Sequence, residues 1–141
     1  MEDKVIKQVS VFVENKPGRL AAITEKLYEE NINIRAFTIA EAGDFGIIRM
    51  VVDDTEKAYR TLKSSGFTVS LTDVLGVEVE DEPGGLYRIA NALGSAGVNI
   101  EYVYAFTWGR DKALVILRVD NIEKAVEVLE KENALFKDRV D

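Results

Sequence analysis

The sequence contains neither cysteine nor histidine among its 141 residues. Without cysteine there is no disulfide framework, no thiolate nucleophile and no sulfur ligand for a metal. Without histidine, the usual general base and the commonest transition-metal ligand are missing as well. These absences exclude much enzyme chemistry, so we expect a protein that is not an enzyme and that carries no cofactor and no metal.

Long apolar runs and basic clusters are also lacking. No stretch approaches the roughly 20 apolar residues of a membrane span, and the amino-terminal MEDKVIKQ lacks the basic region and apolar block of a signal peptide. The net charge is −7, from 25 acidic and 18 basic residues, so the attraction that drives binding to nucleic acids is absent. We expect a cytoplasmic protein that binds neither nucleic acid nor membranes.

Proline is scarce, and the only two prolines lie at matching points of an internal repeat. ENKPGRL at residues 14–20 aligns with EDEPGGL at 80–86, an offset of 66 residues, which becomes 67 after one insertion, most simply in GRDK at 109–112. Asn31 aligns with Gly97, and both residue types tolerate the left-handed conformation that ends many helices. We therefore expect the first helix of each copy to stop there.

Each copy has the pattern of the same series of elements. Alternating valines over 9–13 predict a strand with one buried face, and the spacing of Leu20, Ile23 and Leu27 predicts an amphipathic helix. In the first copy we predict strands at 9–13, 32–40, 48–52 and 68–71 and helices at 20–27 and 55–65. In the second copy we predict strands at 75–79, 98–106, 115–119 and 135–140 and helices at 86–93 and 122–132.

The order βαββαβ, found twice, is that of the ferredoxin-like unit. We therefore predict an α+β protein of two tandem ferredoxin-like units, each an antiparallel sheet with helices on one face. The expected domains are residues 1–72 and 73–141. No linker rich in proline, serine or glycine separates them, and TDV at 72–74 is the only candidate break.

The third strand of each copy is apolar on the face that points away from the predicted core. The residues concerned are Ile47, Val51, Leu114 and Ile116. A solvated sheet face would be polar there, and a unit of about 70 residues is only marginally stable alone. We expect this face to be covered by the other copy or by a second chain, and we predict a homodimer formed through sheet edges or faces.

The two Pro-Gly pairs lie where a strand turns into a helix. Proline suits the first position of a helix, and the following glycine lets another group approach the main chain closely. Unpaired N–H groups at 18–20 and 84–86 would then point outward at the positive end of the helix dipole, which favours a carboxylate. Asn15 and Asp81 just upstream offer oxygens to an ammonium group, so the pattern favours a zwitterion.

The same residues also have a purely structural interpretation. Pro-Gly is common at strand-to-helix junctions, and Asn15 or Asp81 can cap the helix by accepting a hydrogen bond from a backbone N–H. Duplication copies structural turns as faithfully as binding turns. On the residues alone, both interpretations stay open.

The pattern [D/N]-x-P-G-x-L, followed by a helix and a strand with [I/V]-N-I, resembles the ACT domain. It occurs twice, as NKPGRL…NINI and DEPGGL…GVNI, and the resemblance covers nearly the whole chain. It is similar above all to small stand-alone proteins made of two ACT units. The resemblance implies a regulatory, non-catalytic protein of amino acid metabolism that binds a small ligand, typically an amino acid, at the interface between units.

The resemblance also implies the site residues. In the first copy they are Asn15, Pro17, Gly18, Arg19, Leu20, Asn33 and Ile34, and in the second Asp81, Pro83, Gly84, Gly85, Leu86, Asn99 and Ile100. The copies are not equivalent, because Asp81 carries a charge that Asn15 lacks and Gly85 lacks the side chain of Arg19. The two sites can therefore differ in affinity.

Other functions stay open at this point. One is an interaction subunit that docks on a biosynthetic enzyme, as the regulatory subunits of acetohydroxyacid synthase do. An acylphosphatase-like hydrolase would need Arg19 or Arg35 with Asn31 or Asn33, but no activated nucleophile or phosphate loop accompanies them. An RNA-binding sheet disagrees with the charge and with the absence of a basic-aromatic strand motif.

Overall fold

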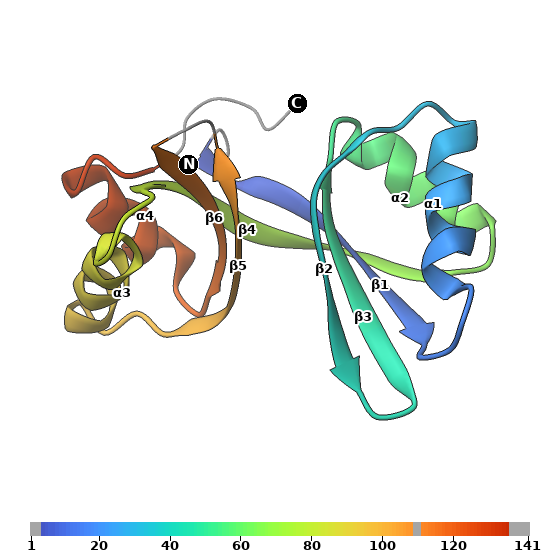
Figure 1. Ribbon diagram of the computed structural model, residues 1–141, viewed down its shortest axis with the longest axis horizontal. Helices are drawn as coiled ribbons and strands as arrows, with labels where there is room; N and C mark the ends of the chain where they lie inside the picture. The colour runs from blue at the N-terminus through green and yellow to red at the C-terminus, as the bar shows by residue number, and fades with distance from the viewer. Residues whose placement is uncertain (1–3, 109–110, 136–141) are drawn as a thin grey trace. The chain divides into compact units, whose positions relative to one another are not determined.

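The computed structural model describes residues 4–108 and 111–135, and this part of the chain separates into two compact units (Figure 1). The first unit is Lys7–Thr72. The second contains residues 73–135 together with 4–6. Each unit is an α+β layer structure in which two helices lie on one face of a sheet, so the predicted fold class is confirmed.

The first unit has the predicted βαββαβ order. Its elements are β1 (Ile6–Glu14), α1 (Arg19–Glu29), β2 (Ile34–Ala42), β3 (Phe45–Val52), α2 (Thr55–Ser64) and the first part of β4 (Thr68–Glu80). The strands lie in the order β2-β3-β1-β4, and β3 pairs antiparallel with both β1 and β2. Strand β1, which leads into the Pro-Gly turn, therefore lies between β3 of the hairpin and β4.

The second unit repeats this arrangement. Its elements are the later part of β4, then α3 (Gly85–Ser95), β5 (Ile100–Trp108), β6 (Lys112–Val119) and α4 (Ile122–Lys131). The strand order is β4-β6-β5. Of the strand predicted at 135–140, only Leu135 is described, and it forms an antiparallel bridge with Val77; the rest lies outside the described residues.

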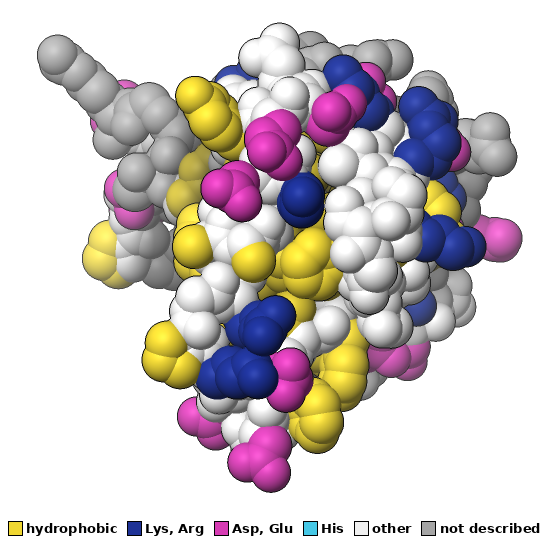
Figure 2. Space-filling model, turned by 90° about the vertical axis from the view of Figure 1, so that its right-hand side faces the viewer, with side chains coloured by type: hydrophobic (Ala, Val, Ile, Leu, Met, Phe, Trp, Pro, Cys, Tyr) yellow, Lys and Arg dark blue, Asp and Glu magenta, His cyan; other side chains and the backbone are white. Residues whose placement is uncertain are grey.

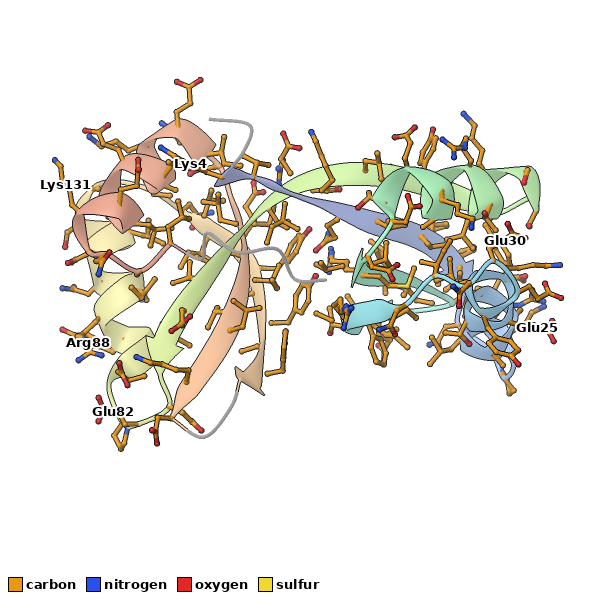
Figure 3. All side chains as sticks on the ribbon, turned by 90° about the horizontal axis from the view of Figure 1, so that it is seen from above. Lys4, Glu25, Glu30, Glu82, Arg88 and Lys131 are labelled. Atoms are coloured by element: carbon orange, nitrogen blue, oxygen red, sulfur yellow. The ribbon has the colours of Figure 1, made fainter. Side chains whose placement is uncertain are left out.

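The amino-terminal segment packs with the second unit. Val5 contacts the apolar core of that unit, and Lys4 Nζ lies 2.8 Å from Glu130 Oε2 of α4 (Lys4 is labelled in Figure 3). Val5 thus adds apolar surface to the core that also contains Leu135.

Strand β4 differs from the prediction. Separate strands were expected at 68–71 and 75–79, with a possible break at 72–74, but the structure has one strand from Thr68 to Glu80. The reason lies in local composition, because threonine and valine favour extended backbone and no glycine or proline interrupts them between 68 and 75. The end of the first copy and the start of the second are one element.

Two separate apolar cores hold the helices on their sheets. In the first, Val9 and Val11 of β1 are fully buried against Ile23 of α1 and Leu62 of α2. In the second, the corresponding residues are Leu75, Val77, Ile89 and Leu129. Burying one such side chain contributes about 1.5–3 kcal/mol. The start of each first helix is therefore anchored one turn beyond the Pro-Gly pair.

The outward face of the third strands is placed as predicted. Ile48, Met50 and Val52 belong to the first core, so Ile47 and Val51, which alternate with them along β3, point away from the helices. The same alternation in β6 places Leu114 and Ile116 opposite Val115 and Leu117 of the second core.

The turns also follow the repeat. Asn31 and Gly97 have positive φ values of 58° and 80°, two residues beyond the ends of α1 and α3, as the alignment predicted. Two residues separate β2 from β3, whereas three separate β5 from β6. The single insertion therefore lies in the second hairpin, where GRDK was expected to hold it.

Among the described residues, no helix is both long enough and apolar enough to cross a membrane. Within residues 4–108 and 111–135, no three acidic side chains gather into a metal-binding group. Figure 2 shows acidic and basic side chains interspersed over one face, with hydrophobic side chains exposed between them, so that face presents no patch of a single charge.

Candidate ligand site at the Pro-Gly turns

Each Pro-Gly pair forms the centre of a tight turn rather than the first position of a helix. In the first unit the N–H of Arg19 donates to the carbonyl of Lys16 at 3.4 Å, and Gly18 has φ 90° and ψ −9°. This is the geometry of a type II turn, which favours proline at its second position and requires positive φ at its third. The expectation that Pro17 begins the helix is wrong, because α1 begins at Arg19.

The turn leaves backbone donors open at the start of α1. The first hydrogen bond of the helix runs from the N–H of Ala22 to the carbonyl of Gly18, at 2.9 Å. Among the described residues, the N–H groups of Gly18, Leu20 and Ala21 have no acceptor. Such groups concentrate the positive end of the helix dipole, so this terminus suits an anion.

The second unit repeats the geometry closely. Gly84 has φ 89° and ψ −8°, and the N–H of Gly85 donates to the carbonyl of Glu82 at 3.1 Å. The first helical bond runs from Arg88 to the carbonyl of Gly84, also at 3.1 Å. By the same count within the described chain, the N–H groups of Gly84, Leu86 and Tyr87 are open.

The capping interpretation is not what the structure shows for α1 and α3. Neither helix has a side-chain cap. The Asn15 side chain instead donates from Nδ2 to the carbonyl of Gly43 at 3.1 Å, and the backbone N–H of Asn15 donates to the carbonyl of Asp44 at 2.8 Å. Asn15 therefore ties the turn to the β2–β3 hairpin, and none of the described residues donates to its side-chain oxygen.

The other two helices are capped, which makes the contrast informative. In α2 the Asp54 side chain accepts from the N–H of Lys57 at 3.2 Å, and in α4 the Asn121 side chain accepts from the N–H of Lys124 at 3.1 Å. The same fold thus satisfies a helix start with a side chain twice and leaves it open twice. Both open starts follow a Pro-Gly turn.

The charges around the two turns differ. Beside the first, Glu14 lies between two cations, with Lys16 Nζ at 3.2 Å and Arg19 Nη2 at 3.9 Å. Beside the second, Lys112 is paired with Glu80, and this carboxylate raises the pKa of the lysine above its ordinary value of 10.5. The first site is the more cationic of the two.

A further ion pair joins α3 to the second turn. Arg88 Nη2 lies 4.0 Å from Glu82 Oε1 (both are labelled in Figure 3). Leu86 is 46% exposed, whereas its counterpart Leu20 packs against the first core. The two copies therefore share a backbone and differ in the surface around it.

The remaining predicted residues lie at the opposite end of each unit. Ala42 pairs with Phe45, which pairs with Glu14, so Ala42 is level with the first turn. Ile34 begins β2 eight residues earlier, which corresponds to roughly 26 Å along a strand. In the second unit, Ile100 begins β5 and Trp108 ends it, so Ile100 is separated from the second turn by the same length of strand. A single unit therefore does not bring the two groups together.

This second group has its own local structure. The N–H of Asn33 donates to Asp53 Oδ1 at 3.0 Å, and the N–H of Asp53 donates back to the carbonyl of Asn33 at 3.1 Å. Asn99 and Asp120 repeat this pair, with a distance of 2.9 Å to the carboxylate. The two aspartates, which the repeat aligned but which were not predicted as site residues, fix the backbone where β2 and β5 begin.

Comparison with known proteins defines the class to which this fold and these turns belong. A family model described as an ACT domain pair matches residues 4–140. The chain belongs to this family, and the resemblance seen in the sequence is confirmed. A search of curated proteins finds no match.

Among solved structures, protein BT0572 from Bacteroides thetaiotaomicron is similar over 94% of this chain and 92% of its own, with 45% identity and a TM-score of 0.90. The regulatory subunit of aspartate kinase from Thermus thermophilus, in a ligand-free form, has 19% identity and a TM-score of 0.68 over 89% of this chain and 91% of its own. The subunit from Thermus flavus has 18% identity and a TM-score of 0.62, covering 89% and 90%. At such identities the two subunits share the fold alone.

Proposed function

We propose that this ACT domain pair is a regulatory protein of amino acid metabolism that binds an amino acid at its Pro-Gly turns and catalyses no reaction. The observation that carries the proposal is the contrast between uncapped α1 and α3 and capped α2 and α4. Unsatisfied donors at a helix start are a ready site for a carboxylate. The free oxygen of Asn15 and the carboxylate of Asp81 complement the ligand's ammonium group.

We further propose that the ligand lies between units. Asn33 and Ile34 lie far from the turn of their own unit, so they contribute only where the turn of a different unit or chain meets the start of β2. Asn99 and Ile100 relate to the second turn in the same way. Residues 1–72 and 73–141 would act as the two domains of a cytoplasmic homodimer that associates through sheet edges or faces, and the ligand would favour one arrangement of them.

A specific observation supports a second candidate function, an interaction subunit of a biosynthetic enzyme. Strand β2 is an edge strand of the first unit, and its Phe37 and Ile39 are 51% and 49% exposed. Exposed apolar side chains on an edge strand favour association with another chain. Retention of a large enzyme subunit when the protein is purified from its own cells would favour this candidate.

The proposal is tested by thermal unfolding of the full chain in the presence of each proteinogenic amino acid. At 100 times its dissociation constant, a ligand stabilises the native state by about 2.7 kcal/mol, which corresponds to roughly 5–10 °C in a chain of this size. If no amino acid and no related metabolite changes the melting temperature, the interaction-subunit candidate takes precedence.

A variant then tests the turn itself. Ala21→Pro removes one open donor, and because that N–H makes no helical bond, proline is tolerated in this first turn. We expect it to weaken binding at the first site about tenfold, since a charge-assisted hydrogen bond is worth about 1.5–3 kcal/mol. Ala21→Ser keeps the N–H and serves as the matched control. Equal binding by both variants would contradict a role for this donor.

A further inference from the structure

A cavity of about 410 Å³ lies within the first unit, on the flank of the Pro-Gly turn. Its lining residues are Phe12, Val13, Glu14, Arg19, Phe45, Ser65, Gly66, Phe67 and Thr68. They come from the end of β1, the start of α1, the start of β3 and the turn between α2 and β4. Arg19, the first residue of α1, is among them, whereas Leu20 and Ala21, which carry the open N–H groups, are not.

One wall of the cavity is aromatic. The rings of Phe12 and Phe45 are stacked, with centroids 5.0 Å apart and planes inclined by 21°. Their side chains are 46% and 43% exposed, whereas alternate residues of the same two strands belong to the core. Stacked rings at the edge of a hollow offer a flat apolar surface to an aromatic or branched group.

The polar side of the cavity is a guanidinium group whose hydrogen-bonding capacity is not used. Arg19 Nε is buried and has no hydrogen-bond partner among the described residues. Glu14 Oε1 lies 3.9 Å from Arg19 Nη2, which is too long for a hydrogen bond. A carboxylate that displaced Glu14 from this edge of Arg19 would accept two parallel hydrogen bonds from Nε and Nη2.

The internal repeat shows that the fold does not demand these side chains. The second unit has a cavity of about 640 Å³ at the equivalent place, lined in part by Val79, Glu80 and Ala134. There Glu78 replaces Phe12, Lys112 replaces Phe45 and Gly85 replaces Arg19. The cavity is thus common to both copies. The second cavity is also lined by Tyr87 and Arg88 on α3, but among the described residues a stacked pair of rings lines only the first.

We propose that the first-unit cavity binds a small carboxylate that carries an aromatic or branched apolar group, at a site that does not use the open N–H groups of Leu20 and Ala21. The volume lies within the roughly 300–1,000 Å³ of small-molecule sites. The apolar group would lie against Phe12 and Phe45, and the carboxylate would pair with Arg19. A free acid and an amino acid share this chemistry and differ in the ammonium group, which Glu14 would accept once displaced from Arg19.

The test is a two-dimensional amide NMR titration of the full-length protein with three probes. 3-Phenylpropionate has the carboxylate and the ring, phenylalanine adds the ammonium group, and phenethylamine lacks the carboxylate. We expect the first two probes to shift the amide signals of residues 65–68, and we expect phenethylamine to leave those signals in place. Tighter binding of phenylalanine would assign the site to amino acids, and tighter binding of phenylpropionate would assign it to free acids.

A matched pair of variants locates the binding. Phe45→Ala removes one ring of the aromatic wall and should weaken phenylpropionate binding at least about tenfold; Phe37→Ala removes an equally exposed ring outside the cavity and should leave binding unchanged. If Phe45→Ala loses its dispersed spectrum, Phe45→Leu, which keeps an apolar group, replaces it. Phe45→Leu should still bind phenylpropionate more weakly than Phe37→Ala does. The proposal is overturned if phenethylamine shifts residues 65–68 equally, if both alanine variants bind alike, or if neither carboxylate shifts those residues at about 10 mM. Shifts confined to Leu20 and Ala21 would also overturn it, while supporting the proposed function.

Discussion

Position 85 shows how one residue separates the two copies. A Cβ atom on Gly85 would lie 2.2 Å from the carbonyl oxygen of Glu80, so this position excludes every side chain, although its counterpart is Arg19. The neighbouring Gly84 is constrained differently. A Cβ there would meet open space, and the constraint is its φ of 89°, which side chains other than glycine adopt at a cost. A larger residue at 84 therefore strains the backbone without crowding the helix start.

We predict that Gly85→Ala lowers the free energy of unfolding by about 3 kcal/mol, because the backbone must move to relieve the contact with Glu80. Gly94→Ala is the matched control in the same helix. Nothing lies within 4 Å of its added Cβ, and alanine should stabilise the helix by about 0.5–1 kcal/mol. Urea denaturation measures both changes, and a loss of less than about 1 kcal/mol at position 85 would contradict the tight approach seen here.

The ion pair between Lys112 and Glu80 should make the stability of the folded state depend on pH. Hydrogen bonding to Glu80 raises its pKa above 10.5. A raised pKa means that the ion pair stabilises the folded state fully below pH 10.5 and that this contribution is lost as the pH rises through the folded-state pKa. We predict that the midpoint of the Lys112 side-chain titration, followed by NMR, lies above 10.5 and falls in Glu80→Gln. A midpoint that does not respond to this substitution would rule out the pair.

At the scale of elements, the starts of the helices fall into two classes. Asp54→Ala and Asn121→Ala remove side-chain caps, and each should cost about 1 kcal/mol in the free energy of unfolding. Asp81→Ala should change it by less than about 0.5 kcal/mol, because Asp81 precedes α3 without capping it. Denaturant unfolding of the three variants distinguishes the classes. A loss of about 1 kcal/mol for Asp81→Ala would mean that the second turn is closed by its own side chain.

Most elements were predictable because the pattern that indicates each of them occurs in both copies of the repeat. The substitution of Gly97 for Asn31 marked the ends of α1 and α3, and both residues have positive φ. The ends of α2 and α4 have the corresponding pair in the opposite order, with glycine in the first copy (Gly66) and asparagine in the second (Asn133), and both have positive φ. This pair could have predicted where the second helix of each copy ends. Pro17 was misplaced because proline suits both a helix start and the second position of a type II turn.

Strand β4 shows a limit of local patterns. The alternation of apolar residues indicates that a strand is present, but it does not show where one copy's last strand ends and the next copy's first begins. In this chain they are continuous from Thr68 to Glu80. A change of partner strand leaves no mark on the residues of the strand itself.

At the scale of the whole molecule, the sequence predicted the repeat, the fold class and the family, but it did not predict the geometry of the site. Residues near positions 15 and 33 share one family motif, yet β2 places them at opposite ends of a unit. The lateral cavities left no motif either, because Phe12, Arg19 and Phe45 become neighbours only after the strands pair. The structure shows that these three residues and their counterparts Glu78, Lys112 and Gly85 line equivalent cavities. Only then can the differences between the two copies be related to ligand binding.

The central claim is that backbone N–H groups left open by the Pro-Gly turns bind the carboxylate of an amino acid. Amide proton chemical shifts measured at saturation with the amino acid that gives the largest thermal shift test it most directly. The account predicts that the largest downfield changes occur at Leu20 and Ala21, at Leu86 and Tyr87, or at both pairs. Saturable binding that leaves all four amide protons unmoved would contradict it.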